Sequence, residues 1–245
     1  MLRWFSKWGN PSAKMEVTEE HLGNSANSTG NVITLRGIQF SLEGMSPKMR
    51  AVLIEGEYEL MEADACATWV KEGDRVLELG SAIGFIGLHC LKNCGAASVV
   101  SVEANPRTAE CLKENYRLNG LAPQVLKVAV TTKDEEVDLY VGPDFWSDSV
   151  CLGFEETENI RVPGCKFTTL WQSLAAKPNV LVVDIEGEET AIDWSHLPTE
   201  IKLLVVEFHP VQTGYDSMFE MIRCVLNSGF EGVLQNGYVN VFRRD

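Results

Sequence analysis

Acidic side chains and one histidine follow two apolar segments in the second half of the sequence. Asp184 ends the apolar run 179–184, Glu186 follows it, and His209 comes directly after the run 201–208. Carboxylates and imidazoles take up and release protons near neutral pH when their surroundings adjust their pKa. Because the carboxyl ends of parallel strands meet at one edge of a sheet, these groups are expected to share a site.

A turn with two glycines joins an apolar strand to a helix within residues 76–87. Three residues separate Gly80 from Gly84, Glu78 precedes them, and Glu103 ends the next apolar segment. In an open α/β sheet this turn lies where ligands bind, and glycine lets the backbone approach a ligand closely. A strand-end carboxylate can accept two hydrogen bonds from a ribose diol. The alternatives are a junction without a ligand and a carboxylate that serves the dipole of the following helix.

The spacing of this turn disfavours two common nucleotide sites. A dinucleotide fingerprint needs further glycines where Ala82 and Phe85 stand, and the lysine of a phosphate-binding loop is missing. The turn is therefore expected to bind a small ligand other than NAD.

Strands and helices alternate from residue 75 onward, which predicts an α/β fold with a doubly wound, mostly parallel sheet. The Asn236-Gly237 pair predicts a final antiparallel hairpin. The expected strands are 75–79, 98–103, 124–130, 179–184, 201–208, 230–234 and 238–242, and the expected helices are 84–93, 106–119 and 216–227, with a short helix after Glu188.

The first 45 residues are expected to form an N-terminal arm and a hairpin, and residues 46–245 the main domain. Alternation over 32–35 and 38–42 predicts the hairpin, and residues 47–69 are expected to be helical with a break near Gly56.

Together these motifs resemble the FkbM-type family of class I S-adenosylmethionine-dependent methyltransferases. The resemblance covers residues 50–245 and lies in five segments, which are Gly56–Glu59, Leu77–Gly84, Val102–Pro106, Val183–Glu189 and Val206–Pro210. It implies a Rossmann-like sheet of seven strands, bound S-adenosylmethionine, and methyl transfer to a hydroxyl of a sugar or secondary metabolite.

The resemblance also implies roles for single residues in cofactor binding. Gly80 and Gly84 would flank the methionine part, Glu78 would lie near its ammonium group, and Glu103 would hold the ribose. Asn105 would lie beside the adenosine. Two further residues, Tyr58 and Glu59, are candidates for covering the cofactor, with packing in the core as the alternative for Tyr58.

An alcohol must lose its proton as it attacks a methyl group, which calls for a positioned base or a metal ion. Asp184 and Glu186 match the family pattern and are candidate catalytic residues together with His209, for which a structural role is the alternative. Glu188 and Glu189 are expected to decorate a helix N-terminus. Mg²⁺ suits such carboxylates, but the sequence does not specify an octahedral set of ligands.

Three aromatic residues lie between the third and fourth strands of the main pattern, where an acceptor pocket could form. These are Phe145, Trp146 and Trp171, and core packing is their alternative role.

The net charge of −14 makes a nucleic acid an unfavourable partner, because its phosphates would be repelled. A small molecule or a glycan is the expected acceptor; a protein acceptor and a cofactor-binding module without catalysis are the alternatives. Seven cysteines without an export signal indicate the cytoplasm, no apolar run is long enough to span a bilayer, and a homo-oligomer is compatible with the sequence.

Overall fold

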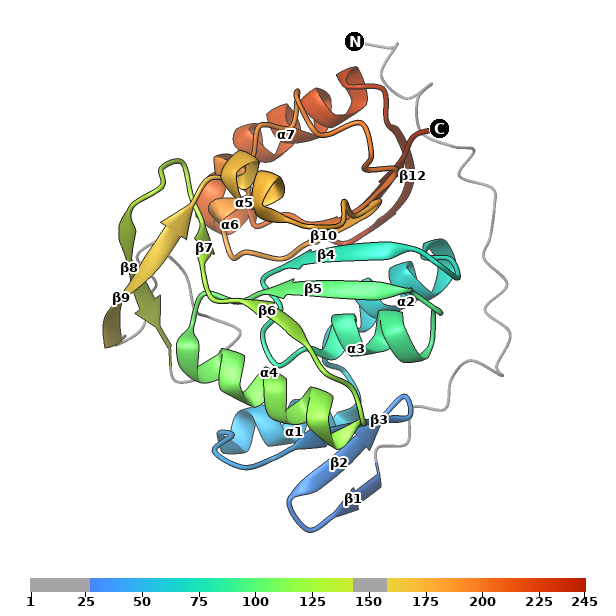
Figure 1. The fold of residues 1–245 in the computed structure, drawn as a ribbon, viewed down its shortest axis with the longest axis vertical. Coiled ribbons are helices and arrows are strands. Elements are labelled where there is room, and N and C mark those ends of the chain that lie inside the picture. The colour runs from blue at the N-terminus through green and yellow to red at the C-terminus, as the bar shows by residue number, and fades with distance from the viewer. Residues whose placement is uncertain (1–26, 143–157) are drawn as a thin grey trace.

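The computed structural model describes residues 27–142 and 158–245, and its centre is a seven-stranded sheet (Figure 1). The strand order is β12-β13-β11-β10-β4-β5-β6. The four pairs from β11 to β6 are parallel, and β13 is antiparallel to both β11 and β12. The predicted doubly wound, mostly parallel sheet with a C-terminal hairpin is therefore confirmed. The strands are β4 (Arg75–Leu79), β5 (Ser98–Val102), β6 (Gln124–Leu126), β10 (Val180–Val183), β11 (Leu203–Glu207), β12 (Glu231–Asn236) and β13 (Val239–Arg243).

The central strands are mainly apolar because both faces of the sheet are covered. In β4, Val76 belongs to the cluster on one face, and Leu77 and Leu79 belong to the cluster on the other. The helices are α1 (Pro47–Glu55), α2 (Leu60–Trp69), α3 (Phe85–Lys92), α4 (Pro106–Leu118), α5 (Phe167–Ser173), α6 (Pro210–Thr213) and α7 (Tyr215–Asn227), with the 3₁₀ turn η4 (Glu188–Ala191). Helices α2 and α3 contribute to the first cluster, and α5 and α7 to the second.

A small sheet of β1 (Asn27–Thr29), β2 (Val32–Leu35) and β3 (Ile38–Ser41) precedes α1. The predicted hairpin is confirmed. Its backbone is held to α4, because Asn115 Oδ1 accepts the Ser41 N–H at 2.9 Å and Asn119 Oδ1 accepts the Gln39 N–H at 3.0 Å. Its buried side chains join the same cluster as α2 and α3.

The segment 124–130, expected to form one strand, forms two. Residues beyond β6 leave the main sheet, and β7 (Ala129–Val130) pairs with β9 (Glu158–Cys165), which also pairs with β8 (Glu136–Val141). Lys127 interrupts the run and forms an ion pair with Glu110 on α4. In the described ranges, no helix is both long and apolar enough to cross a membrane.

Candidate functional site

The turn after β4 brings the carboxyl ends of β4 and β10 into contact. Gly80 has φ +80°, and a Cβ on it would lie 1.5 Å from the carbonyl oxygen of Asp184. The Asp184 N–H donates to the Leu79 carbonyl at 2.9 Å. Glycine is therefore required at position 80 both by its conformation and by the approach of β10.

The carboxylate of Glu103 stabilises this turn through hydrogen bonds. It accepts hydrogen bonds from the Ala82 N–H at 2.9 Å and the Asn105 N–H at 2.8 Å, and the residue is 7% exposed. Asn105 caps α4, since its Oδ1 accepts the Arg107 N–H at 2.9 Å. Each carboxylate oxygen has two acceptor positions, so a ribose hydroxyl can still be bound by Glu103. The predicted cofactor roles of Glu103 and Asn105 stay predictions.

Glu78 lies beneath α3, where its carboxylate forms hydrogen bonds within the protein. Its carboxylate accepts from the Gly87 N–H at 2.9 Å and the Ser101 hydroxyl at 2.8 Å, and burial raises its pKa to about 7. Gly84 faces α4, because a Cβ there would lie 2.9 Å from the ring of Tyr116. These contacts join α3 and α4 to the sheet, and the predicted contacts of Glu78 and Gly84 with the methionine part stay predictions.

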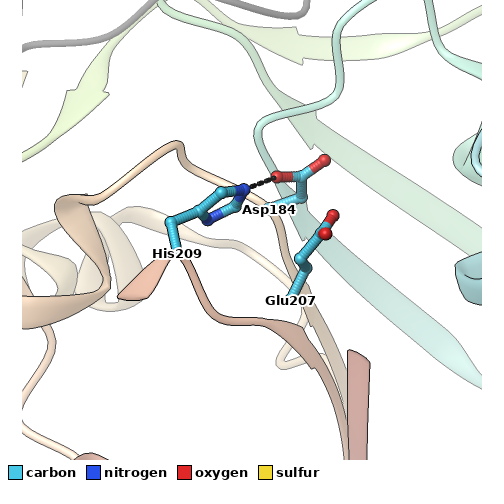
Figure 2. Close-up of side chains that lie close together, drawn as sticks. All are labelled: Asp184, Glu207 and His209. Carbon is cyan, nitrogen blue, oxygen red and sulfur yellow. Dashed lines mark ion pairs between the residues drawn. The ribbon is translucent and has the colours of Figure 1, made fainter. Parts of the chain in front are cut away.

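His209 lies among three carboxylates at the ends of β10 and β11. Its Nδ1 is 2.9 Å from Glu189 Oε1, and its Nε2 is 3.4 Å from Asp184 Oδ1 and 3.6 Å from Glu186 Oε2. Figure 2 shows the imidazole directed at Asp184, with the Glu207 carboxylate beside them. The three predicted catalytic residues Asp184, Glu186 and His209 are thus brought together.

The surroundings favour protonated forms in this group. Burial raises the pKa of Asp184 to about 8, an effect that the charge of His209 opposes. Burial alone would lower the pKa of His209, but the hydrogen bond to Glu189 and the charges of Asp184 and Glu186 raise it to about 10. These contacts favour the imidazolium form of His209, and the raised pKa of Asp184 lies in the range where a general base is effective.

Three further carboxylates border this group. Glu62 on α2 is hydrogen-bonded to Glu207 at the end of β11, and burial together with the charge of Glu207 raises its pKa to about 8. Glu59 begins α2 with φ +46°, a conformation that is uncommon for a residue with a side chain. Burial and the charge of Asp184 hold the pKa of Glu59 well above its ordinary value. The candidate site is therefore rich in carboxyl groups whose burial favours the protonated form.

Tyr58, predicted to cover the cofactor, is 5% exposed and packs in the core, with its ring centroid 5.8 Å from that of Phe85. Trp171 is also a core residue, 8% exposed and packed against Phe167. Phe145 and Trp146 lie outside the described residues.

Asp184, Glu207 and His209 are also the one group in the described part of the chain with three potential metal ligands within 4.8 Å of one another. The His209 nitrogen that faces this group already pairs with a carboxylate, and Mg²⁺ prefers six oxygen ligands. We therefore assign no metal here.

Sequence reasoning missed the roles of Glu62 and Glu189. Glu62 lies in a helical stretch with no motif, and only the packing of α2 brings it to Glu207. Glu189 lies in the first turn of η4, as expected, but the sequence did not predict that its side chain is fully buried against His209. The acidic pattern of residues 184–189 was the available signal for Glu189.

One family model, described as the TRM5/TYW2 methyltransferase domain, matches residues 56–155, which is less than half of the chain. Combined with the strand order around the glycine turn, this match decides the class of the domain. It is an S-adenosylmethionine-dependent methyltransferase.

The predicted resemblance to the FkbM-type family is wrong, because the matching model is that of TRM5/TYW2. The motifs that suggested it, such as 77–84 and 183–189, surround the carboxyl edge of the central sheet. Class I methyltransferases in general place their cofactor at this edge, so these motifs do not separate one family from another.

No curated protein matches the chain. Among solved structures, Trm5b from Pyrococcus abyssi is 15% identical with a TM-score of 0.47, and 90% of this chain and 56% of that chain are covered. M. jannaschii TYW2 in complex with AdoMet is 12% identical with a TM-score of 0.41, and 89% of each chain is covered. A SAM-dependent methyltransferase from Agrobacterium tumefaciens is 14% identical with a TM-score of 0.47, and 89% of this chain and 71% of that chain are covered.

Proposed function

We propose that this methyltransferase transfers the methyl group of S-adenosylmethionine to a hydroxyl group of an uncharged or cationic acceptor, and that Asp184 receives the proton. The observation that carries the proposal is the position of Asp184. It lies against the glycine turn, with its carboxylate beside the imidazolium of His209. This places a carboxylate of raised pKa at the edge where class I sheets bind their ligands.

The reaction is an in-line displacement at the methyl carbon. A lone pair of the acceptor oxygen forms the new O–C bond, the C–S bond breaks, and its electron pair stays on sulfur, leaving neutral S-adenosylhomocysteine. The hydroxyl proton passes to the Asp184 carboxylate. Because the sulfonium is already a good leaving group, alignment and removal of the proton are what the protein supplies.

Glu103 is proposed to hold the ribose of the cofactor. Isothermal titration with S-adenosylmethionine and S-adenosylhomocysteine tests this, with NAD as the control ligand. Wild-type protein is expected to bind the first two only, and Glu103→Ala is expected to bind them at least about tenfold more weakly, since a charged acceptor contributes about 1.5–3 kcal/mol. Unchanged affinity in a folded Glu103→Ala sample would remove Glu103 from the cofactor site.

The net charge of the molecule indicates which class of acceptor it can bind. The sequence has 35 acidic and 21 basic residues, which gives a net charge of −14 at pH 7. This charge would repel an anionic acceptor as it approaches the protein, whereas a neutral hydroxylated molecule, a glycan, or a cationic group on a protein would not be repelled. Among these acceptors we favour a small molecule or a glycan, which is also the acceptor expected from the sequence.

A second candidate function is methylation of tRNA, to which the match with the TRM5/TYW2 domain points. An assay with methyl-labelled cofactor separates the candidates when hydroxylated small molecules and glycans, proteins, and tRNA are offered in parallel. Label in the first class supports the proposal. Label in tRNA, retained at physiological salt and lost in Asp184→Asn, would replace it with the second candidate.

A further inference from the structure

Glu189 is a fully buried carboxylate that the proposed reaction leaves without a role. Its side chain is 0% exposed, its Oε1 accepts the Gly187 N–H at 3.1 Å, and the same oxygen lies 2.9 Å from His209 Nδ1. Its Oε2 has no hydrogen-bond partner among the described residues. A buried carboxylate is costly unless a positive group compensates it, and His209 is the basic side chain that contacts it.

The backbone around Glu189 is fixed. Its carbonyl accepts the indole N–H of Trp194 at 2.8 Å and the N–H of Ile192 at 3.3 Å, and Gly187 precedes the 3₁₀ turn with φ +107°. Trp194 is itself buried, 3% exposed, against Phe208. The carboxylate therefore occupies a rigid position from which it can orient the imidazole.

The hydrogen bond at Nδ1 determines what the other ring nitrogen does. A carboxylate can only accept, so Nδ1 carries a hydrogen and donates it to Glu189. Nε2 is then the nitrogen directed at Asp184 and Glu186, at 3.4 and 3.6 Å. The same arrangement, in which a buried carboxylate holds a histidine by one nitrogen, is how the orientation and tautomer of functional histidines are commonly fixed.

We infer that Glu189 is a positioning residue of the methyl-transfer site, which holds the ring of His209 in place and keeps it positively charged beside Asp184. The effect on catalysis rests on the proposed role of Asp184 as the proton acceptor. The effect on His209 itself does not. Glu189 acts through His209 and is not expected to touch the cofactor or the acceptor.

Several titratable groups face the imidazole, and Glu189 contacts it most closely. They are Glu62 from α2, Asp184 and Glu186 from the segment after β10, Glu189 from η4 and Glu207 from β11. Burial opposes the charged ring, and among the interactions that raise the pKa of His209 the hydrogen bond that it donates to Glu189 contributes most. Neutralising Glu189 alone is therefore expected to be visible in the titration of the ring.

The test is a titration of the histidine rings in the full chain by nitrogen-15 NMR, with His209→Asn to identify the signal of His209. The wild-type ring is expected to stay doubly protonated at pH 7. In Glu189→Gln, which keeps the shape and an acceptor oxygen, the midpoint is expected to fall by about one pH unit or more, a tenfold change in proton affinity. Glu231→Gln, an exposed change of the same charge on β12, is the matched control and is expected to leave the midpoint unchanged.

A neutral His209 ring at pH 7 in the wild-type protein would overturn the inference without any variant, and so would an unchanged midpoint in a folded Glu189→Gln protein. Neither result depends on methyl transfer, so they are distinguishable from a failure of the proposed function. Once an acceptor is known, Glu189→Gln is expected to lower kcat about tenfold with unchanged cofactor affinity, and Glu189→Asp, which restores the charge, to recover part of the loss.

Discussion

At the scale of single residues, Asp184 is the group on which the proposed chemistry depends. Its backbone joins β4 and β10 through the Leu79 carbonyl, while its side chain pairs with His209. The backbone contact survives a change of side chain, so the structural and chemical roles of this residue can be separated by substitution.

Asp184→Asn is expected to lower turnover by about 10²–10⁴-fold, the usual contribution of a general base, because an amide cannot accept the proton. Affinity for S-adenosylmethionine should change by less than about threefold, since the variant keeps the backbone contacts of the turn. Radiolabel transfer and calorimetry measure the two effects, and Asp216→Asn, an exposed change on α7, is the control. Turnover within threefold of wild type would remove Asp184 as the base.

The pH dependence of the rate follows from the same carboxylate. Asp184 must be ionised to act as a base, and burial raises its pKa to about 8 against the opposing charge of His209. Thus kcat/KM for the cofactor should rise about tenfold per pH unit below pH 8 and level off above it. The positive sulfonium of bound cofactor favours the ionised form, so the corresponding rise in kcat should occur at lower pH. A rate that is flat from pH 6 to 9 would contradict this assignment.

At the scale of elements, the sequence predicts the parts of the fold whose pattern is local. The strand 75–79 was predicted residue for residue, because an apolar run ends at a glycine turn. The segment 124–130 was not, because β7 leaves the main sheet to pair with β9, and a local pattern cannot show which sheet a strand joins. The antiparallel strands β8 and β9 were not predicted, because the sequence between 133 and 167 carries no specific motif.

The candidate site shows the same division. Gly80, Glu103, Asp184 and His209 lie at strand ends, and a predicted sheet is enough to gather them at one edge. Glu62 and Glu189 could not be assigned in this way, because packing of α2 and η4, rather than the sheet, sets their positions. A buried carboxylate has no sequence signature of its own.

Glu78 links α3 to β4 and β5, and we expect it to make stability depend on pH. Its folded pKa of about 7 lies above the ordinary value of 4.5, so between these values the folded protein binds more protons than the unfolded chain. The free energy of unfolding therefore falls as pH rises through this window, by up to about 3 kcal/mol.

Glu78→Gln should remove this dependence, since the amide can accept from the Gly87 N–H and donate to the Ser101 hydroxyl. Denaturant titration at pH 5, 6.5 and 8 should show the free energy of unfolding of the variant increasing relative to that of wild type as pH rises. The same pH dependence of this free energy in both proteins would contradict the prediction. Calorimetry on the same variant tests the expected contact of Glu78 with the cofactor. If that contact exists, Glu78→Gln should bind S-adenosylmethionine more weakly than wild type.

At the scale of the whole molecule, the N-terminal hairpin is part of the same hydrophobic core as the methyltransferase helices. Ile33, Leu35, Ile38 and Phe40 are fully buried, and the rings of Phe40 and Phe85 are 5.7 Å apart at their centroids. Figure 1 shows the hairpin beside α1 and α4, away from the edge strand β12. The boundary expected at residue 46 therefore crosses a packed region rather than a linker.

Phe40→Ala is expected to lower the free energy of unfolding by about 3–5 kcal/mol, because it leaves a cavity against α3. Gln39→Ala, on the exposed face of the same strand, should change it by less than about 0.5 kcal/mol. Denaturant titration of both variants measures the difference. If residues 46–245 formed an independent domain, deletion of residues 1–45 would leave its unfolding transition intact; we expect instead that the deletion exposes the apolar surface of Leu53 and Phe85 and abolishes the cooperative transition.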